Sequence, residues 1–212
     1  MAGTVFGRRA LGAASLALIL IALFSPLADW GEHRSFAAHM AQHLLLGDLA
    51  PLALVLATRP RLPRVAALLA FPAWAANLAV WHVPAVYEVA LHHGFVHLAQ
   101  HAALFAGGAL LWAAIVGEAL RLGARLGVVV GMMFFGLALS SVFLWWPRVL
   151  YSTYAHAGGW AGMSPVTDQR AGGGLMLLEG TFVAVAAAAW LILQLFRDEA
   201  VPRVAEHVSP SP

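Results

Sequence analysis

Cysteine and lysine are both absent from this 212-residue sequence, and charged residues make up only 10% of it. Without cysteine, the chain has neither disulfide bonds nor thiolate metal sites. Without lysine, its 12 basic residues are all arginines. Apolar residues are abundant instead: 61% of the chain is hydrophobic and the mean hydropathy is +0.80. These values are typical of a polytopic membrane protein and exclude an ordinary soluble domain.

Six apolar segments are each close to the about 20 residues that a helix needs to cross a bilayer. We predict an all-α transmembrane bundle with a single domain over residues 1–197, followed by a disordered cytoplasmic tail over residues 198–212. Pro51 removes a backbone hydrogen bond from the second segment and is expected to kink it. The predicted transmembrane helices span residues 11–28, 36–57, 65–83, 95–117, 126–146 and 171–196.

Arginine sets the expected orientation, because short cytoplasmic loops of membrane proteins collect positive charge. In a six-helix arrangement nine arginines fall on one side and three on the other. We assign the larger group to the cytoplasm, which places both termini there and makes the loops 29–35, 84–94 and 147–170 extracytoplasmic. The sequence pI near 9.7 then reflects topology, and nucleic-acid binding has no support. The smaller group is Arg34, Arg148 and Arg170.

Two pairs of histidines lie inside the predicted helices. His39 and His43 are four residues apart and share one face of the second helix, and His97 and His101 repeat that spacing in the fourth. Both helices run inward from the outer surface, so the two pairs are expected at similar depth. A titratable side chain in hydrocarbon is costly and needs a partner, which makes these pairs a candidate functional site.

A fifth histidine, His82, is expected at the same depth in the membrane as the two pairs. The third helix runs outward and ends with His82, just before Pro84. Of the ten histidines, only His207 is assigned to the cytoplasmic side. Neutral imidazole is a common ligand for copper, zinc, iron and nickel, so a metal or haem role is favoured for the two pairs and His82. The remaining histidines are interpreted as interfacial residues at the rim: His33, His92, His93 and His156.

Carboxylates form a second group of candidates. Asp168 precedes the sixth helix on the outer side, where it would ligate metal, orient a ligating imidazole or cap the helix. Asp48 and Glu179 lie deep in the second and sixth helices. There they would either form part of an ion path or make a hydrogen bond between helices. Tyrosines and tryptophans near the outer interface are interpreted as an aromatic belt: Trp81, Tyr87, Trp145, Trp146, Tyr151, Tyr154 and Trp160.

Four segments together resemble the CtaG family of cytochrome c oxidase assembly factors. They are residues 39–47 (HMAQHLLLG), 81–87 (WHVPAVY), 96–101 (VHLAQH) and 164–169 (SPVTDQ). Their order and topology carry the resemblance, since an HxxxH motif alone is common. Two departures from the family pattern are Gln100, where many relatives have an acidic residue, and Leu177-Leu178-Glu179, where a Trp and a Pro are usual.

The resemblance implies a multi-pass protein of the bacterial inner membrane that is needed to make active terminal oxidase of the respiratory chain. It implies copper handling on the outer side, with cytochrome c oxidase subunits and copper chaperones as partners in addition to membrane lipid. The residues at the family's motif positions, and hence the predicted metal ligands, are His39, His43, His82, His97, His101 and Asp168.

Two other functions fit a histidine-rich membrane protein. One is a metalloenzyme similar to di-iron desaturases and oxygenases, although the histidine clusters of those enzymes face the cytoplasm. The other is a membrane cytochrome in which facing histidines such as His43 and His101 ligate haem iron. A metal-handling assembly factor is favoured over a catalyst, and the sequence leaves the oligomeric state open.

Overall fold

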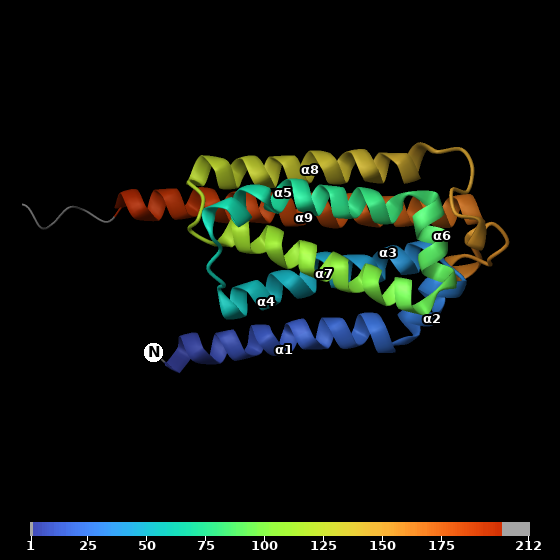
Figure 1. Cartoon of the computed structure of the whole chain (residues 1–212), viewed down its shortest axis with the longest axis horizontal. Coiled ribbons are helices and arrows are strands. Elements are labelled where there is room, and N and C mark those ends of the chain that lie inside the picture. The colour runs from blue at the N-terminus through green and yellow to red at the C-terminus, as the bar shows by residue number, and fades with distance from the viewer. Residues whose placement is uncertain (1, 201–212) are drawn as a thin grey trace, which may run out of the picture.

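The computed structural model describes residues 2–200, with side chains described for residues 5–196, and every long element in it is a helix (Figure 1). In this part of the chain six helical spans are long and apolar enough to cross a membrane, as predicted. Of the predicted tail, residues 198–200 still belong to the last helix, and residues 201–212 lie outside the described residues. The spans are Val5–Phe24, Phe36–Thr58, Arg64–His82, Gly94–Val116, Leu122–Trp145 and Pro165–Phe196.

The long helices lie side by side along one axis, and the beginning of α1 (Ala2–Phe24) lies at the same end of the bundle as the end of α9 (Pro165–Ala200) (Figure 1). Two short helices lie at the opposite end, where loops were predicted: α2 (Pro26–His33) and α6 (Pro84–His92). Each starts with a proline, whose fixed φ favours the first turn of a helix. A cap hydrogen bond from Leu27 N–H to the Ser25 hydroxyl completes the start of α2.

The second membrane span is interrupted as expected from Pro51, but by a wider turn instead of a simple kink. It consists of α3 (Phe36–Leu44), the π-helical turn η1 (Leu45–Leu49) and α4 (Ala50–Thr58). Because Pro51 has no N–H, it leaves the carbonyl of Gly47 without its helical donor, and the chain widens in the turn just before it. The backbone bond from Ala50 N–H to the Leu45 carbonyl spans five residues and marks this turn.

Small residues let the remaining helices approach closely around this span. The helix α9 packs along α8 (Leu122–Trp145) and α3, while α7 (Gly94–Val116) packs against α4 and α5 (Arg64–His82). A Cβ at Gly172 would lie 2.6 Å from a ring carbon of Phe36, and one at Gly108 would collide with the Gly47 carbonyl. These contacts bring α3, α7 and α9 close together in the region where the histidines lie.

Candidate metal centre

The two histidine pairs come from α3 and α7, which begin at the same end of the bundle and run in the same direction (Figure 1). His39 and His43 lie one turn apart on α3, and His97 and His101 one turn apart on α7. All four side chains are buried, with exposed fractions of 0–7%. The equal depth that the sequence predicts for the two pairs therefore brings four imidazoles together.

The four imidazoles form one compact group. One ring nitrogen of each can be chosen so that all four lie within 4.8 Å of one another. Nε2 of His39 and Nε2 of His97 lie 3.4 Å apart. A tetrahedral ion with metal–nitrogen bonds of about 2.0–2.1 Å holds its ligand nitrogens about 3.3 Å apart. The cluster therefore has the size of a metal centre, and a small inward movement of the rings would complete it.

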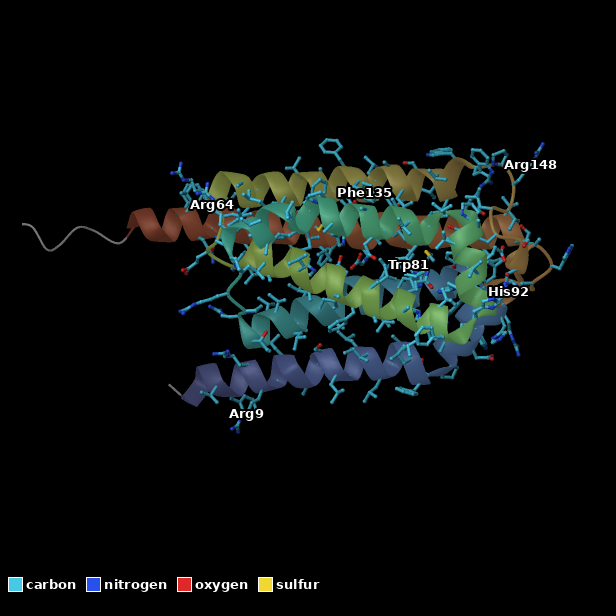
Figure 2. The ribbon with its side chains drawn as sticks, viewed as in Figure 1. Arg9, Arg64, Trp81, His92, Phe135 and Arg148 are labelled. Atoms are coloured by element: carbon cyan, nitrogen blue, oxygen red, sulfur yellow. The ribbon has the colours of Figure 1, made fainter. Side chains whose placement is uncertain are left out.

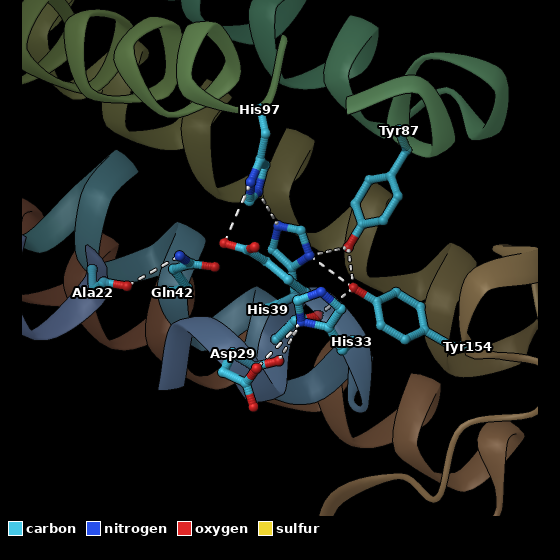
Figure 3. Close-up of polar contacts among 10 residues, drawn as sticks. Ala22, Asp29, His33, His39, Gln42, Tyr87, His97 and Tyr154 are labelled. Carbon is cyan, nitrogen blue, oxygen red and sulfur yellow. Dashed lines mark hydrogen bonds and ion pairs between the residues drawn. The ribbon is translucent and has the colours of Figure 1, made fainter. Parts of the chain in front are cut away.

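Hydrogen bonds on the far side of His39 fix which of its nitrogens faces the centre (Figure 3). The hydroxyl of Tyr154 donates to the Gly31 carbonyl at 2.6 Å, so its oxygen accepts from Nδ1 of His39 at 2.8 Å. The hydroxyl of Tyr87 lies 3.0 Å from the same nitrogen. Nδ1 thus carries the proton, and the lone pair of Nε2 points into the cluster, the arrangement that metal-ligating histidines usually have.

The partner of His97 is a carboxylate. Nδ1 of His97 lies 3.5 Å from Oε1 of Glu32 on α2, which favours a proton on that nitrogen and a lone pair on Nε2. The Nε2 atoms of His39 and His97 then face each other with two lone pairs. Such a contact is repulsive unless a proton or a cation lies between the two atoms.

His82 lies beside the group of four, at the end of α5. Its ring centroid is 6.1 Å from that of His43. Nδ1 donates to the Leu78 carbonyl at 2.8 Å, since a carbonyl oxygen only accepts, and this leaves a lone pair on Nε2. The structure therefore brings His82 to the edge of the cluster but outside the set of mutually close ligand atoms.

Several nitrogens of the cluster are buried without any hydrogen-bond partner among the residues that the structure describes. They are both ring nitrogens of His43, Nε2 of His82 and Nε2 of His101. An unsatisfied buried polar group costs about 1–3 kcal/mol. A neutral imidazole offers one lone pair, so a metal ion in the cluster would satisfy one nitrogen each of His43 and His101. The residues present therefore fit a metal better than they fit an apolar core.

All three tyrosines of the chain lie behind the histidines, which corrects their interpretation as an aromatic belt. Tyr87, Tyr151 and Tyr154 are at most 2% exposed, and the Tyr151 hydroxyl donates to the His82 carbonyl at 3.0 Å. Burial raises the pKa of all three phenols well above 10, so they remain protonated and neutral. Their segments flank the predicted membrane–water interface in sequence, which suggests an aromatic belt. In the structure these segments fold inward over the histidine cluster.

Asp168 is buried at the same end but outside the group of four histidines. Its carboxylate accepts from the hydroxyl of Ser35 at 2.7 Å, the N–H of Phe36 at 2.6 Å and the N–H of Trp160 at 3.0 Å. It thus caps the start of α3 and not its own helix, and it fixes the helix that carries His39. Its role as a direct ligand stays a prediction.

The other histidines in the described part of the chain lie away from the cluster. His33 and His92 each bond to a carbonyl four residues earlier in their own short helix, at the exposed end of the molecule (Figure 2 labels His92). His93 and His156 are also exposed. Sequence reasoning missed Glu32, Tyr87 and Tyr154 as supports of the site. The available indication was that Tyr87 closely follows the predicted ligand His82 in sequence, whereas nothing local marks Glu32 or Tyr154.

Comparison with known proteins identifies the family of this chain. The sequence profile of the cytochrome c oxidase caa3 assembly factors, Caa3_CtaG, matches residues 3–198. No curated protein and no solved structure matches the chain. The match covers all six membrane spans and every predicted site residue, and it is to a family of assembly factors and not of enzymes. The resemblance found in the sequence is thereby confirmed: this multi-pass membrane protein belongs to the family of cytochrome c oxidase caa3 assembly factors.

Proposed function

We propose that this assembly factor binds a copper ion between His39, His43, His97 and His101 and passes it to a subunit of cytochrome c oxidase. The observation that supports this function most strongly is the group of four buried imidazoles with ligand atoms within 4.8 Å of one another. Membership of the caa3 assembly family supports the oxidase as the recipient. His82 is the additional ligand through which the ion would enter or leave.

Copper is the cargo that agrees best with the donor set. Imidazole nitrogen binds copper, zinc, iron and nickel, and among divalent ions of the first row copper is bound most tightly. The absence of cysteine leaves only neutral nitrogen ligands at the cluster, from which an ion exchanges more readily than from thiolates. Exchange is what a delivery protein requires. In this proposal Asp168 acts on the site through the start of α3.

A haem site has less support. The cavity next to His43 and His82 has a volume of about 80 Å³, whereas pockets for organic ligands have about 300 Å³ or more. The four rings also pack against one another, with centroids 4.1–6.4 Å apart. A macrocycle would have to separate α3 from α7. An iron-dependent enzyme has no support from the family match.

The site is proposed to face the outside of a bacterial inner membrane. Arg9 and Arg64 lie at one end of the bundle, and Arg148 and His92 lie at the other (Figure 2). The second end is the one at which α3 and α7, the helices that carry the cluster, begin (Figure 1). Most arginines belong to the segments at the first end, and cytoplasmic loops collect positive charge. The cluster is therefore assigned to the extracytoplasmic half of the membrane. The beginning of α1 and the end of α9 are assigned to the cytoplasmic side.

One experiment tests the metal and its side together. Spheroplasts that contain the protein are treated with an impermeant Cu(I) chelator, and the metal content of the purified protein is measured before and after treatment. We expect about one copper or more per chain before treatment and a loss of copper after it, with no iron and no Soret band. Copper that is lost only from inverted vesicles would contradict the orientation. Protein without copper in either preparation would contradict the proposed function.

A further inference from the structure

A second polar region lies deeper in the membrane than the histidine cluster. A cavity of about 80 Å³ that is open to a water-sized sphere extends from His43 and His82 at one end to Asp48 and Glu179 at the other. A single water needs roughly 10–15 Å³ of such volume, so several waters or one partly hydrated ion fit into this space. The cavity adjoins the proposed metal centre, because His43 belongs to both.

The cavity wall holds polar atoms that have no protein partner among the described residues. They belong to His43, His82, Ser140 and Glu179, and the first three of these residues are 6%, 8% and 0% exposed. Buried polar atoms in native proteins almost always have a partner, and an exception usually marks a water, an ion or a function. Four such side chains from α3, α5, α8 and α9 around one space indicate a polar occupant.

The π-helical turn explains why Asp48 contributes to this cavity. Asp48 follows His43 by five residues, and in a regular α-helix such residues point about 140° away from each other. The five-residue hydrogen bonding of η1 brings positions five apart back to the same side. The turn therefore places the carboxyl group of Asp48 on the side of the helix that His43 occupies, one turn deeper, where Trp112 Nε1 donates to it at 2.6 Å.

Glu179 of α9 completes the deep end of the cavity. Its carboxyl group lines the same cavity as that of Asp48, and its Oε1 is buried without a hydrogen-bond partner among the described residues. Two carboxyl groups beside one cavity in the membrane cannot both remain charged unless a proton or a cation compensates them. With one proton the pair has a net charge of −1, which a monovalent cation in the cavity would neutralise.

Four methionines also line the cavity: Met40, Met132, Met133 and Met176. Thioether sulfur is a soft ligand that favours Cu(I), and imidazole nitrogen also binds copper. We propose that this cavity is a second holding site for Cu(I), in which the Asp48–Glu179 pair supplies the negative charge and His43 and His82 exchange the ion with the outer cluster. This inference rests on the proposed function, because the ion reaches the cavity through the histidines.

The number of copper ions per chain tests the inference. Purified protein in detergent is titrated with Cu(I) under ascorbate against a chelator of known affinity, and bound copper is counted by elemental analysis. We expect two Cu(I) per chain for the unaltered protein and one for the variant with Asp48→Asn and Glu179→Gln. Both substitutions preserve the size of the side chain, and asparagine still accepts the hydrogen bond from Trp112. Each variant is checked for folding by circular dichroism and size-exclusion chromatography.

Glu118→Gln serves as the matched control, because Glu118 is exposed and does not line this cavity. It is expected to keep two Cu(I). A count of one in the unaltered protein, or of two in the Asp48→Asn, Glu179→Gln variant, would overturn the deeper site and leave the histidine centre standing. A count of zero in the unaltered protein would overturn the proposed function instead. If the double variant does not fold, Asp48→Asn alone is counted, with a loss of at least tenfold in affinity for the second ion expected.

Discussion

Replacing both His43 and His101 with leucine is expected to reduce caa3 oxidase activity in membranes to the level of cells without this protein. The double substitution removes one imidazole from each helix and leaves only His39 and His97 of the four clustered ligands. Two neutral nitrogens are a poor site for an ion that must be held in hydrocarbon. The measurement is oxidase activity and copper content of membranes from cells that produce the variant in place of the natural protein.

The same variant separates a metal function from a scaffold function. Leucine is similar in size to histidine, and it removes ring nitrogens that are buried without partners among the described residues. Replacing unsatisfied polar groups by apolar groups of similar shape is close to neutral or stabilising. We therefore expect the metal-free variant to have a melting temperature equal to or above that of the metal-free natural protein, although its function is lost.

Exposed histidines provide the control for this prediction. The variant with His92→Leu and His156→Leu changes the same residue type at the same end of the molecule but outside the cluster. It is expected to keep full oxidase activity. Normal oxidase in cells with the His43→Leu, His101→Leu variant would refute a metal role and leave a purely structural one.

The second large effect is expected from the tyrosines that support His39. Tyr154→Phe removes the hydroxyl that accepts from Nδ1 of His39 and leaves the Gly31 carbonyl without its donor. Removing such an outer partner of a ligating histidine weakens metal binding by about 10–100-fold. Because the Tyr87 hydroxyl lies 3.0 Å from the same nitrogen and replaces part of the loss, we expect about tenfold for the single variant.

The variant with both Tyr87→Phe and Tyr154→Phe is expected to lose about 100-fold in copper affinity, since no phenol then orients His39. Affinity is measured by competition with a chelator in detergent. Tyr151→Phe is the matched control: it also removes a buried hydroxyl that donates to a carbonyl, but that hydroxyl does not contact His39. An equal loss of affinity in Tyr151→Phe, or no loss in the double variant, would show that the tyrosines do not act through His39.

The predictable part of this structure is the part determined by local patterns. Each membrane span is long and apolar by itself, so hydropathy identifies all six. The spacing of four residues within each histidine pair is a property of a single helix. Parallel α3 and α7 follow from the number of spans between them, and this is sufficient to place His39 and His43 at the depth of His97 and His101.

The unpredicted part depends on contacts between distant segments. Tyr154 reaches His39 across 115 positions of sequence, and Asp168 caps α3 across 132. Neither contact follows from a local pattern, because each depends on how the connection between α8 and α9 folds over the end of the bundle. The π turn is a similar case: Pro51 indicates a defect, but the close approach of Gly47 to Gly108 belongs to the packed structure.

Buried histidine nitrogens without partners cost free energy in the metal-free protein, and this cost is the physical reason to connect the site with function. An apolar core at the same position would leave no unpartnered nitrogens and would be more stable. The protein instead supports two of the imidazoles with specific acceptors, Tyr154 for His39 and Glu32 for His97. Such support directs lone pairs toward a common point, which benefits a bound ion and has no use in a bundle that only has to pack.

The most direct test of the copper centre is an X-ray absorption spectrum at the copper K-edge of protein loaded with one equivalent of copper. We expect three to four nitrogen ligands at about 2.0 Å, with the multiple-scattering features of imidazole and no sulfur in the first shell. The same spectrum of the His43→Leu, His101→Leu variant should lose this shell. A natural protein that binds no copper, or binds it without imidazole, would contradict the assignment of His39, His43, His97 and His101 as the metal centre.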